Sequence, residues 1–373
     1  MVKRYVADVT IKRKAKNMDK WLMDDCKLKW HMDRIEEHYK HGKRIYPLHV
    51  DIGVAKLCNA KCVYCFGIQQ RMTGEIIPRE PLINLFKDAP RLGIKSITVT
   101  GDGENTLNPA IYDALIVGKK NGLDIGFATN GILLNNDQIK ILLECCVWVR
   151  FNLSAIGKEG YKKIHGVDAW HKVELNIVNA AVLKTKIKIK TDIGLQMVLI
   201  PSALEYVISE TQFAITNELS YFVIKQFSDP KNEQMSRFNL NWYDGGKTKT
   251  ILKQAETMSN NKTQIIPKWG TMGNKGHKGY EHCPDCALIF QISGNSRCYP
   301  CGLLFNREEY CYGDLKKNSL KEILDSDRYW KIVKFMREKF DNKKECEGCA
   351  CRHDKTNKFI WDYLHKPAHI NFV

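Results

Sequence analysis

The chain has 373 residues, of which 44% are hydrophobic and 27% are charged, a balance typical of a soluble globular protein with a full-sized core. Its N-terminus lacks the apolar region of a secretory signal, and no apolar run approaches the roughly 18 residues that a membrane helix needs. We therefore expect a cytoplasmic protein that makes no contact with a membrane.

The formal net charge is +16, and lysine and arginine concentrate near both ends of the chain. Such a charge suits an anionic partner, for example a phosphorylated metabolite, a nucleic acid or an acidic peptide. No recognisable nucleic-acid-binding module accompanies the charge, so we do not expect nucleic acid to be the partner.

The first part of the chain predicts a helical extension followed by alternating strands and helices. Residues 1–47 are basic, and within them residues 17–41 carry apolar side chains at mostly helical spacing, which predicts an amphipathic helix. The predicted strands are 48–55, 94–100, 124–128, 147–153, 192–199 and 221–226. The predicted helices lie near 80–90, 109–121, 136–145, 172–185 and 204–216. Because strand and helix alternate, we expect βα units and a parallel sheet.

Six such units are too few to close an eight-stranded barrel, so the predicted fold class is α/β, with a partial (β/α)6 barrel over residues 48–246. The polar segment 227–246 ends the alternation. Residues 247–282, which include a stretch rich in Gly, Lys and Asn, are predicted to be a linker. Residues 283–373 hold many cysteines and are predicted to form a small C-terminal domain, in which a capping box begins a helix over Ser319–Lys339.

A group of three cysteines follows the first predicted strand. Cys58, Cys62 and Cys65 have the spacing C-x3-C-x2-C. Three thiolates can hold three irons of a cubane cluster and leave the fourth iron open to a small molecule. Zinc sites usually need four protein ligands and favour paired C-x2-C motifs. The spacing therefore favours an iron–sulfur cluster over a zinc loop, at the end of a strand, where parallel sheets place their active sites.

With Tyr64 directly before the third cysteine, this motif resembles the signature of the radical S-adenosylmethionine (SAM) superfamily. The resemblance implies that Cys58, Cys62 and Cys65 bind a catalytic [4Fe–4S] cluster whose open iron binds the amino and carboxylate groups of SAM. It also implies that an electron, from a donor such as flavodoxin or ferredoxin, cleaves SAM to methionine and a 5′-deoxyadenosyl radical. That radical would abstract a hydrogen atom from the substrate.

Further motifs at the ends of the predicted strands resemble SAM-contacting motifs of this family. A GDGE sequence stands in the place of the family's GGE motif, with Asn105 where proline is usual, and a TNG turn ends the third predicted strand. The fourth strand ends with Asn and Ser where the family often has Ser and Asp. The residues that the resemblance implies as SAM contacts are Tyr64, Gly101, Asp102, Gly103, Glu104, Asn130, Asn152, Ser154 and Leu199.

The C-terminal cysteines include the pairs Cys283/Cys286 and Cys298/Cys301, followed by a last group of three, and these could form zinc knuckles. Their order, around a predicted β-hairpin that turns at Gly294-Asn295, resembles the SPASM or twitch extension of radical SAM enzymes, which carries auxiliary [4Fe–4S] clusters. The ligands that the resemblance implies are Cys286, one of Cys298 and Cys301, Cys346 and Cys349. No cysteine follows Cys351, so we expect one auxiliary cluster, and the surplus cysteines leave a second one open.

These observations support three hypotheses on function. The first is a radical SAM enzyme that dehydrogenates, epimerises or decarboxylates a small polar or anionic metabolite, such as a sugar, nucleotide sugar or aminocyclitol. Lys225 is then a candidate contact for an anionic group or a candidate proton donor. The second is a ribosomal-peptide maturase of the SPASM type, although the segment before the first core strand is short for a peptide-recognition domain. The third is a zinc-stabilised nucleic-acid-binding protein.

Overall fold

The structure is a computed structural model that describes residues 20–67, 72–228, 239–274, 277–346, 348–366 and 368–370. The basic residues near the N-terminus, from Lys3 to Lys16, and residues 229–238 of the polar segment 227–246 lie outside the described residues. No described helix is both long and apolar enough to cross a lipid bilayer.

Ten strands form a single open sheet in the order β10-β9-β8-β1-β2-β3-β4-β5-β6-β7. The strands from β8 to β7 run parallel to one another, and β9 and β10 are antiparallel to their neighbours. The strands are β1 (His49–Ile52), β2 (Ser96–Val99), β3 (Asp124–Thr129), β4 (Trp148–Asn152), β5 (Asp192–Leu199), β6 (Tyr221–Gln226), β7 (Gln264–Pro267), β8 (Ile289–Ile292), β9 (Arg297–Tyr299) and β10 (Gly313–Asp314). The predicted α/β class with an open, mainly parallel sheet is confirmed.

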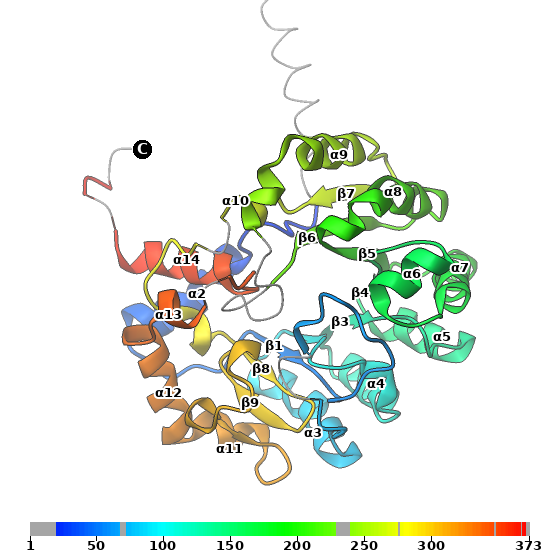
Figure 1. The fold of residues 1–373 in the computed structure, drawn as a ribbon. Coiled ribbons are helices and arrows are strands. Elements are labelled where there is room, and N and C mark those ends of the chain that lie inside the picture. The colour runs from blue at the N-terminus through cyan, green and yellow to red at the C-terminus, as the bar shows by residue number, and fades with distance from the viewer. Residues whose placement is uncertain are drawn as a thin grey trace, which may run out of the picture.

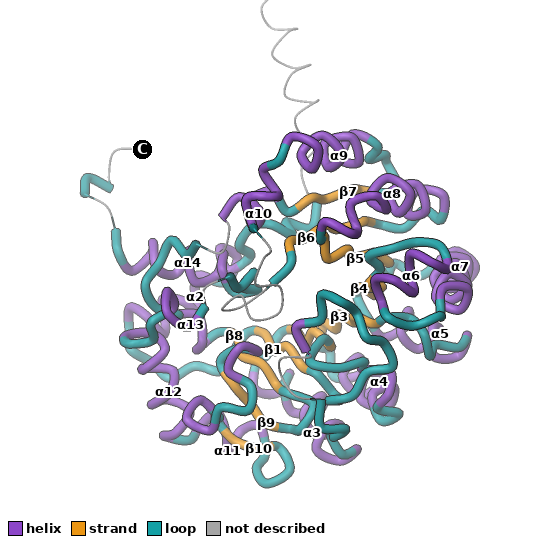
Figure 2. Tube along the Cα trace, in the orientation of Figure 1, coloured by secondary structure: helices purple, strands orange, loops and turns teal. Residues whose placement is uncertain are grey.

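The sheet curves, and the helices that connect its strands lie on its outer side (Figures 1 and 2). The helices of the first part of the chain are α2 (Met32–Ile35), α3 (Arg79–Asp88), α4 (Ile111–Lys120), α5 (Asn136–Cys145), α6 (Lys158–His165), α7 (Trp170–Lys186) and α8 (Val207–Thr216). Those that follow are α9 (Gly246–Thr257), α10 (Trp269–Asn274), α11 (Leu320–Asp325), α12 (Asp327–Glu338), α13 (Asn342–Glu345) and α14 (Asp354–Leu364).

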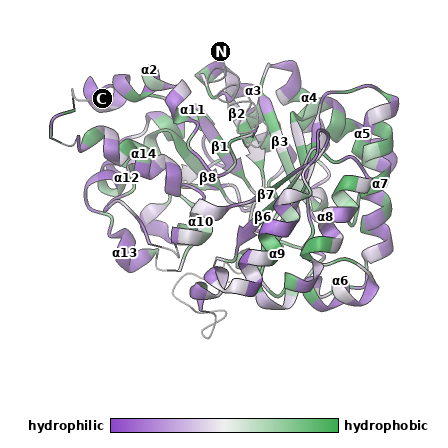
Figure 3. Cartoon of the chain, turned by 90° about the horizontal axis from the view of Figure 1, so that it is seen from above, coloured by the Kyte–Doolittle hydropathy of each residue, from purple (hydrophilic) through white to green (hydrophobic). Residues whose placement is uncertain are grey.

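The two faces of the sheet differ in polarity because side chains alternate along each strand. On β6, Phe222 and Ile224 belong to the large core between the sheet and the outer helices. Lys225 follows them on the opposite, inner face, as Asp51 does beside Val50 and Ile52 on β1. In the view from above, hydrophobic residues concentrate along the strands (Figure 3). The inner face is therefore the place where polar groups from different strands meet.

The segment 247–282, predicted to be a linker, instead contains α9, β7 and α10. β7 pairs in parallel with β6, so a seventh parallel strand extends the predicted six. Its four residues are too short a run for their pattern to stand out among polar neighbours. The predicted helix at 17–41 also differs, since the described part forms a 3-10 turn at Leu28–Trp30, α2 and a π-helical turn at Glu36–Lys40.

The predicted hairpin is present as β8 and β9, and β8 adds in parallel to β1. The cysteine-rich C-terminal part therefore extends the main sheet. The predicted capping box is also present, because the side chain of Ser319 accepts the backbone N–H of Glu322 and the Glu322 side chain accepts the N–H of Ser319. The helix that it begins is interrupted at Ser326, whose hydroxyl caps α12 by accepting the N–H of Tyr329. The domain boundaries at residues 47, 246 and 282 stay predictions.

Candidate active site

The first cysteine group lies in the loop that follows β1, at the carboxyl end of the strand. Cys58 is exposed, whereas Cys62 and Cys65 are half-buried. Burial first, and then the charges of Cys65 and Cys58, raise the pKa of the Cys62 thiol to about 12. The three thiols are therefore close neighbours, and a cation or a cluster bound among them would favour their ionised form.

Tyr64 is a buried residue of this loop, and its hydroxyl group contacts residues at the end of β4. Its hydroxyl oxygen accepts hydrogen bonds from Nδ2 of Asn152 at 2.8 Å and from Oγ of Ser154 at 3.0 Å. The Ser154 oxygen in turn accepts the backbone N–H of Val198 at 3.0 Å. Three residues predicted to contact SAM thus meet, and in this structure Asn152 and Ser154 position Tyr64.

Glu104 joins the GDGE loop to the turn after β3. Its Oε1 accepts the backbone N–H of Thr106 at 3.1 Å and the hydroxyls of Thr106 and Thr129 at 2.8 and 2.6 Å. Its Oε2 accepts the backbone N–H of Asn130 at 2.7 Å. Asn130 then donates from Nδ2 to Oδ1 of Asn59 at 2.7 Å and lies 3.9 Å from Sγ of Cys58. The carboxylate therefore connects two predicted motifs to the cysteine loop.

The glycines of the GDGE loop pack directly against backbone. A Cβ atom at Gly101 would lie 2.2 Å from the Cα of Gly53, and one at Gly103 would lie 2.3 Å from the carbonyl oxygen of Ala55. Neither position has room for a side chain, because the atoms that it would meet belong to the backbone. The sequence motif is therefore explained by a close approach of this loop to the segment after β1.

Asp102 has a different environment from the one that the resemblance implied. Its carboxylate accepts the hydroxyl of Ser293 at 2.6 Å and the backbone N–H of Gly294 at 3.2 Å, both in the β8–β9 turn. The ammonium group of Lys56, which is fully buried, lies 3.6 Å away. Asp102 thus attaches the GDGE loop to the C-terminal hairpin, and a contact between its side chain and SAM stays a prediction.

The expected position of Leu199 needs a correction. Its side chain belongs to the core on the helix side of the sheet, whereas the preceding Val198 packs in the cluster that contains Tyr64. Alternation along β5 explains the difference, because only every second side chain reaches the inner face. Val198 is therefore the apolar residue that faces the cysteine loop.

His165 was not identified from the sequence, although it contacts the cysteine loop. Its Nδ1 lies 3.3 Å from Sγ of Cys62, and its Nε2 accepts the backbone N–H of Ser154 at 3.1 Å. Burial lowers the pKa of His165 to about 3, so the ring is neutral. Its imidazole stacks on Tyr161 with the ring centres 4.2 Å apart. A single histidine at the end of a helix carries no motif by which the sequence could reveal this contact.

Most of the C-terminal cysteines form a second group. Burial first, and then the charges of neighbouring thiols that include Cys351, raise the pKa of Cys283, Cys286, Cys301 and Cys346. A hydrogen bond with Cys349, and then burial, raises the pKa of the Cys351 thiol. Cys298 stands apart on β9, fully buried, with Cys311 as its neighbouring thiol. Of the two cysteines left open by the sequence, Cys301 is the one that lies within the group.

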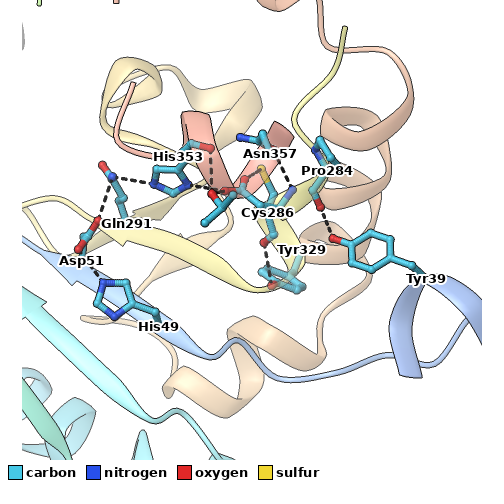
Figure 4. A network of polar contacts seen from close by, with 11 residues as sticks. Tyr39, His49, Asp51, Pro284, Cys286, Gln291, Tyr329, His353 and Asn357 are labelled. Carbon is cyan, nitrogen blue, oxygen red and sulfur yellow. Dashed lines mark hydrogen bonds and ion pairs between the residues drawn. The ribbon is translucent and has the colours of Figure 1, made fainter. Parts of the chain in front are cut away.

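A chain of polar contacts connects this second group to the inner face of the sheet (Figure 4). His353 contacts Asp285 at 3.1 Å and the side chain of Gln291, on β8, at 3.1 Å. Gln291 donates to Asp51 of β1 at 3.3 Å, and Asp51 also contacts His49 at 2.9 Å. The segment that follows the last cysteines therefore packs against the inner face of the sheet at β1 and β8.

Both cysteine groups fit iron–sulfur clusters in their composition and in the proximity of their thiols. Among the residues that the structure describes, no three His, Cys, Asp or Glu side chains are arranged to hold a single metal ion. Cys58, Cys62 and Cys65 would hold the catalytic cluster, and the second group contains enough thiols for a fully ligated auxiliary cluster.

Comparison with known proteins identifies the class. Residues 52–201 match the radical SAM superfamily, and residues 283–350 match an iron–sulfur cluster-binding domain, SPASM. The chain therefore belongs to the radical SAM superfamily of enzymes and carries a C-terminal auxiliary domain of the SPASM type. This membership confirms the resemblance seen in the motifs, and it implies a [4Fe–4S] cluster, SAM and auxiliary iron–sulfur clusters as cofactors.

Individual relatives cover only part of this sequence. A probable GTP 3′,8-cyclase of Saccharolobus islandicus is 32% identical over 130 residues, which span 35% of this chain and 42% of that protein. A probable GTP 3′,8-cyclase of Archaeoglobus fulgidus is also 32% identical over 130 residues, or 43% of its length. The chain thus covers less than half of these curated relatives.

Solved structures share the fold over a longer stretch. Streptococcus suis SuiB bound to its precursor peptide SuiA has a TM-score of 0.63 at 15% identity, over 93% of this chain and 81% of SuiB. The enzyme anSMEcpe with bound AdoMet has a TM-score of 0.59 at 19% identity, over 87% and 94% of the two chains. At these identities the likeness concerns the fold alone.

Proposed function

We propose that this chain cleaves SAM reductively at a [4Fe–4S] cluster held by Cys58, Cys62 and Cys65, and uses the product radical to abstract hydrogen from a small polar metabolite. The observation that carries the proposal is the group of three neighbouring thiols after β1, with Asn130 and Tyr64 beside them. When bound, the cluster would supply one electron to break a C–S bond of SAM, giving methionine and a 5′-deoxyadenosyl radical that becomes 5′-deoxyadenosine on taking the substrate hydrogen.

The protein's part in this reaction is to position groups and to exclude water. Glu104 holds the turn that carries Asn130 against the cysteine loop, and Asn152 and Ser154 fix the ring of Tyr64. Gly101 and Gly103 let the backbone of their loop lie close to the same site. We assign these residues to the SAM site, with Val198 in place of Leu199 as the apolar contact.

The second cysteine group would hold at least one auxiliary cluster. Cys283, Cys286, Cys301, Cys346 and Cys351 supply more thiols than the four that one fully ligated cluster needs. A fully ligated cluster has no open iron, so its natural role is to transfer electrons. In a net oxidation it would accept the electron that the substrate radical loses, while the proton leaves to solvent.

The substrate is proposed as a sugar, nucleotide sugar, aminocyclitol or similar metabolite. The archaeal relatives are named for GTP, and SuiB was solved with a precursor peptide. GTP and a peptide substrate are therefore the direct competitors of the proposed class, and each belongs in the first substrate panel.

The test is anaerobic. The full-length chain is reconstituted with iron and sulfide, reduced with dithionite and supplied with SAM, and 5′-deoxyadenosine is measured together with the electron paramagnetic resonance (EPR) spectrum of the reduced cluster. One variant replaces Cys58, Cys62 and Cys65 with alanine. The matched control replaces three cysteines that stand outside both groups, and these are Cys26, Cys145 and Cys146.

We expect 5′-deoxyadenosine, and a change of the EPR spectrum on adding SAM, from the wild type and the control variant only. A wild-type protein that binds zinc and no iron after reconstitution would contradict the proposal. So would an iron-loaded protein whose EPR spectrum is indifferent to SAM.

A further inference from the structure

Four cationic side chains gather at the inner face of the sheet, and they come from four separate places in the chain. Arg150 lies on β4, Lys225 on β6, Lys268 directly after β7, and Arg352 in the segment before α14. Burial first, and then the charges of Lys268, Arg150 and Arg352, lower the pKa of Lys225 to about 7. The four charges therefore lie close enough to repel one another.

Among the residues that the structure describes, one of these cations, Arg352, forms an ion pair with a carboxylate. Arg352 contacts Oδ1 of Asp51 at 2.8 Å and the hydroxyl of Thr98 at 3.2 Å. Although burial acts against it, the charges of Arg352 and His49 hold the pKa of Asp51 below its usual value, so this carboxylate is ionised. The Asp51–Arg352 pair is thus internally compensated.

Arg150 is held by neutral groups. Its Nε donates to the hydroxyl of Tyr221 at 3.2 Å, and its NH1 group donates to the side-chain oxygen of Gln196 at 3.3 Å. Its guanidinium also lies over the rings of Trp148 and Tyr221, 4.6 and 5.4 Å from their centres. These contacts fix the guanidinium in one orientation without cancelling its charge.

Lys225 and Lys268 have half-buried side chains that form no hydrogen bond or ion pair with any residue in the described ranges. The carboxylate whose charge acts on Lys268 belongs to Asp24, and its oxygens accept the backbone N–H of Gly270 and the hydroxyl of Thr271. Within the described part of the chain, no ion pair therefore compensates the charges of Lys225 and Lys268. Desolvated cations that lack an internal partner are costly unless an anion joins them.

The cations also lie between the two cysteine groups. The side chain of Gln196, which Arg150 contacts, donates to Asn152 at 3.3 Å, and Asn152 donates to the hydroxyl of Tyr64 in the first cysteine loop. On the other side, Arg352 directly follows Cys351 of the second group. A molecule bound at these cations would therefore adjoin the place where hydrogen abstraction is proposed.

We propose that Arg150, Lys225 and Lys268 bind an oxyanion, a phosphate or carboxylate group of the substrate, at the inner face of the sheet, beside the Asp51–Arg352 pair. The inference rests on the proposed function and narrows its substrate class to metabolites that carry such a group. Arg150 offers a rigid, planar donor, and the two lysines offer mobile ammonium groups that adapt to the anion. This assignment excludes, as substrates, sugars and aminocyclitols that carry no phosphate or carboxylate group.

The experiment titrates the anaerobically reconstituted full-length chain with two probes at low ionic strength and pH 6.5, by isothermal calorimetry. Sulfate stands in for a phosphate group, and succinate stands in for a carboxylate. The variants are Lys225→Gln and Lys268→Gln, and the matched control is Lys253→Gln on the exposed side of α9. The affinity for SAM is measured on the same samples.

We expect the wild type to bind at least one probe, and each inner-face variant to bind it at least tenfold more weakly. The control should stay within twofold of the wild type, and SAM affinity should stay within twofold in all variants. The preferred probe then distinguishes a phosphate from a carboxylate.

The proposal is overturned if the wild type binds neither probe, or if the inner-face variants bind as tightly as the control. It is also overturned if these variants lose affinity for SAM in the same proportion, because the cations would then serve the SAM carboxylate. Failure of the proposed function is a separate result, since it is read from 5′-deoxyadenosine formation by the wild type and not from anion binding.

Discussion

The Nδ1 atom of His165 lies 3.3 Å from Sγ of Cys62, and the opposite ring nitrogen, Nε2, accepts the backbone N–H of Ser154. A neutral imidazole carries one proton, and Nε2 is occupied as an acceptor, so the proton resides on Nδ1. His165 therefore donates a hydrogen bond to the sulfur of a cluster ligand. Hydrogen bonds to cluster sulfurs stabilise the more negative, reduced state and raise the reduction potential.

We predict that His165→Leu lowers the midpoint potential of the catalytic cluster, by an amount on the order of tens of millivolts, because one such bond is lost. The measurement is a redox titration followed by EPR spectroscopy. Tyr161→Phe is the control, since it keeps the ring that stacks on His165 and removes a hydroxyl that forms no hydrogen bond in the described part of the chain. An unchanged potential in His165→Leu, with iron content equal to that of the wild type, would show that the contact has no electronic effect.

Replacing Cys298, in the β8–β9 hairpin, and replacing Cys301, in the loop that follows it, should change the iron content of the protein differently. Cys301 lies within the second thiol group, whereas Cys298 is a fully buried residue of β9 whose neighbouring thiol is Cys311. We predict that Cys301→Ser loses the iron of one auxiliary cluster and that Cys298→Ala retains it. The measurement is the iron and sulfide content of the reconstituted variants. Loss of iron in Cys298→Ala, with full iron content in Cys301→Ser, would refute the assignment.

The sequence predicts the architecture well where the hydrophobic pattern is long, and less well where elements are short. Six strands and the hairpin are present as predicted, whereas the four-residue β7 within the expected linker had no readable pattern. The cysteine loop and strand-end motifs could be recognised because they are local. Arg150, His165 and Arg352 could not, since each becomes informative only when the fold brings it to another strand or loop. Leu199 shows that one step along a strand reverses the face that a side chain occupies.

The GDGE loop should tolerate no side chain at Gly103. A Cβ atom there would lie 2.3 and 2.4 Å from the carbonyl oxygens of Ala55 and Leu57, which belong to the segment carrying the cysteines. We predict that Gly103→Ala displaces the loop and weakens SAM binding at least tenfold. Gly246→Ala, where a Cβ atom meets nothing within 4 Å, is the control. Equal SAM affinity in both variants, measured by calorimetry, would argue against this close packing.

Anion binding at the inner face should depend on pH through Lys225. Its pKa of about 7 reflects burial and the neighbouring cations Lys268, Arg150 and Arg352, with Asp51 already paired to Arg352. The ammonium form predominates below this pKa, so we predict that sulfate, whose charge is constant in this range, binds about tenfold more tightly at pH 6 than at pH 8. Lys225→Gln should flatten the profile. A profile that is equally steep in the variant would assign the titration to another group.

Glu210 tests how a buried carboxyl group affects stability. It lies in α8 with no exposed surface, and neither carboxyl oxygen has a hydrogen-bond partner within the described part of the chain. Burial raises its pKa well above the ordinary value of 4.5. Above pH 4.5 the folded protein therefore retains a proton that the unfolded chain releases, so the free energy of unfolding falls as pH rises.

We predict that Glu210→Gln, which cannot ionise, raises the free energy of unfolding by about 1–3 kcal/mol at pH 8 and changes it little at pH 5. Anaerobic denaturant unfolding of the reconstituted protein at the two pH values provides the measurement. The control is Glu205→Gln, an exposed carboxylate that lies 3.7 Å from Lys163 and should shift stability by less than about 0.5 kcal/mol. If Glu210→Gln is equally stable or less stable at pH 8, the side chain must find a partner in solution, and the cost assigned to its burial is wrong.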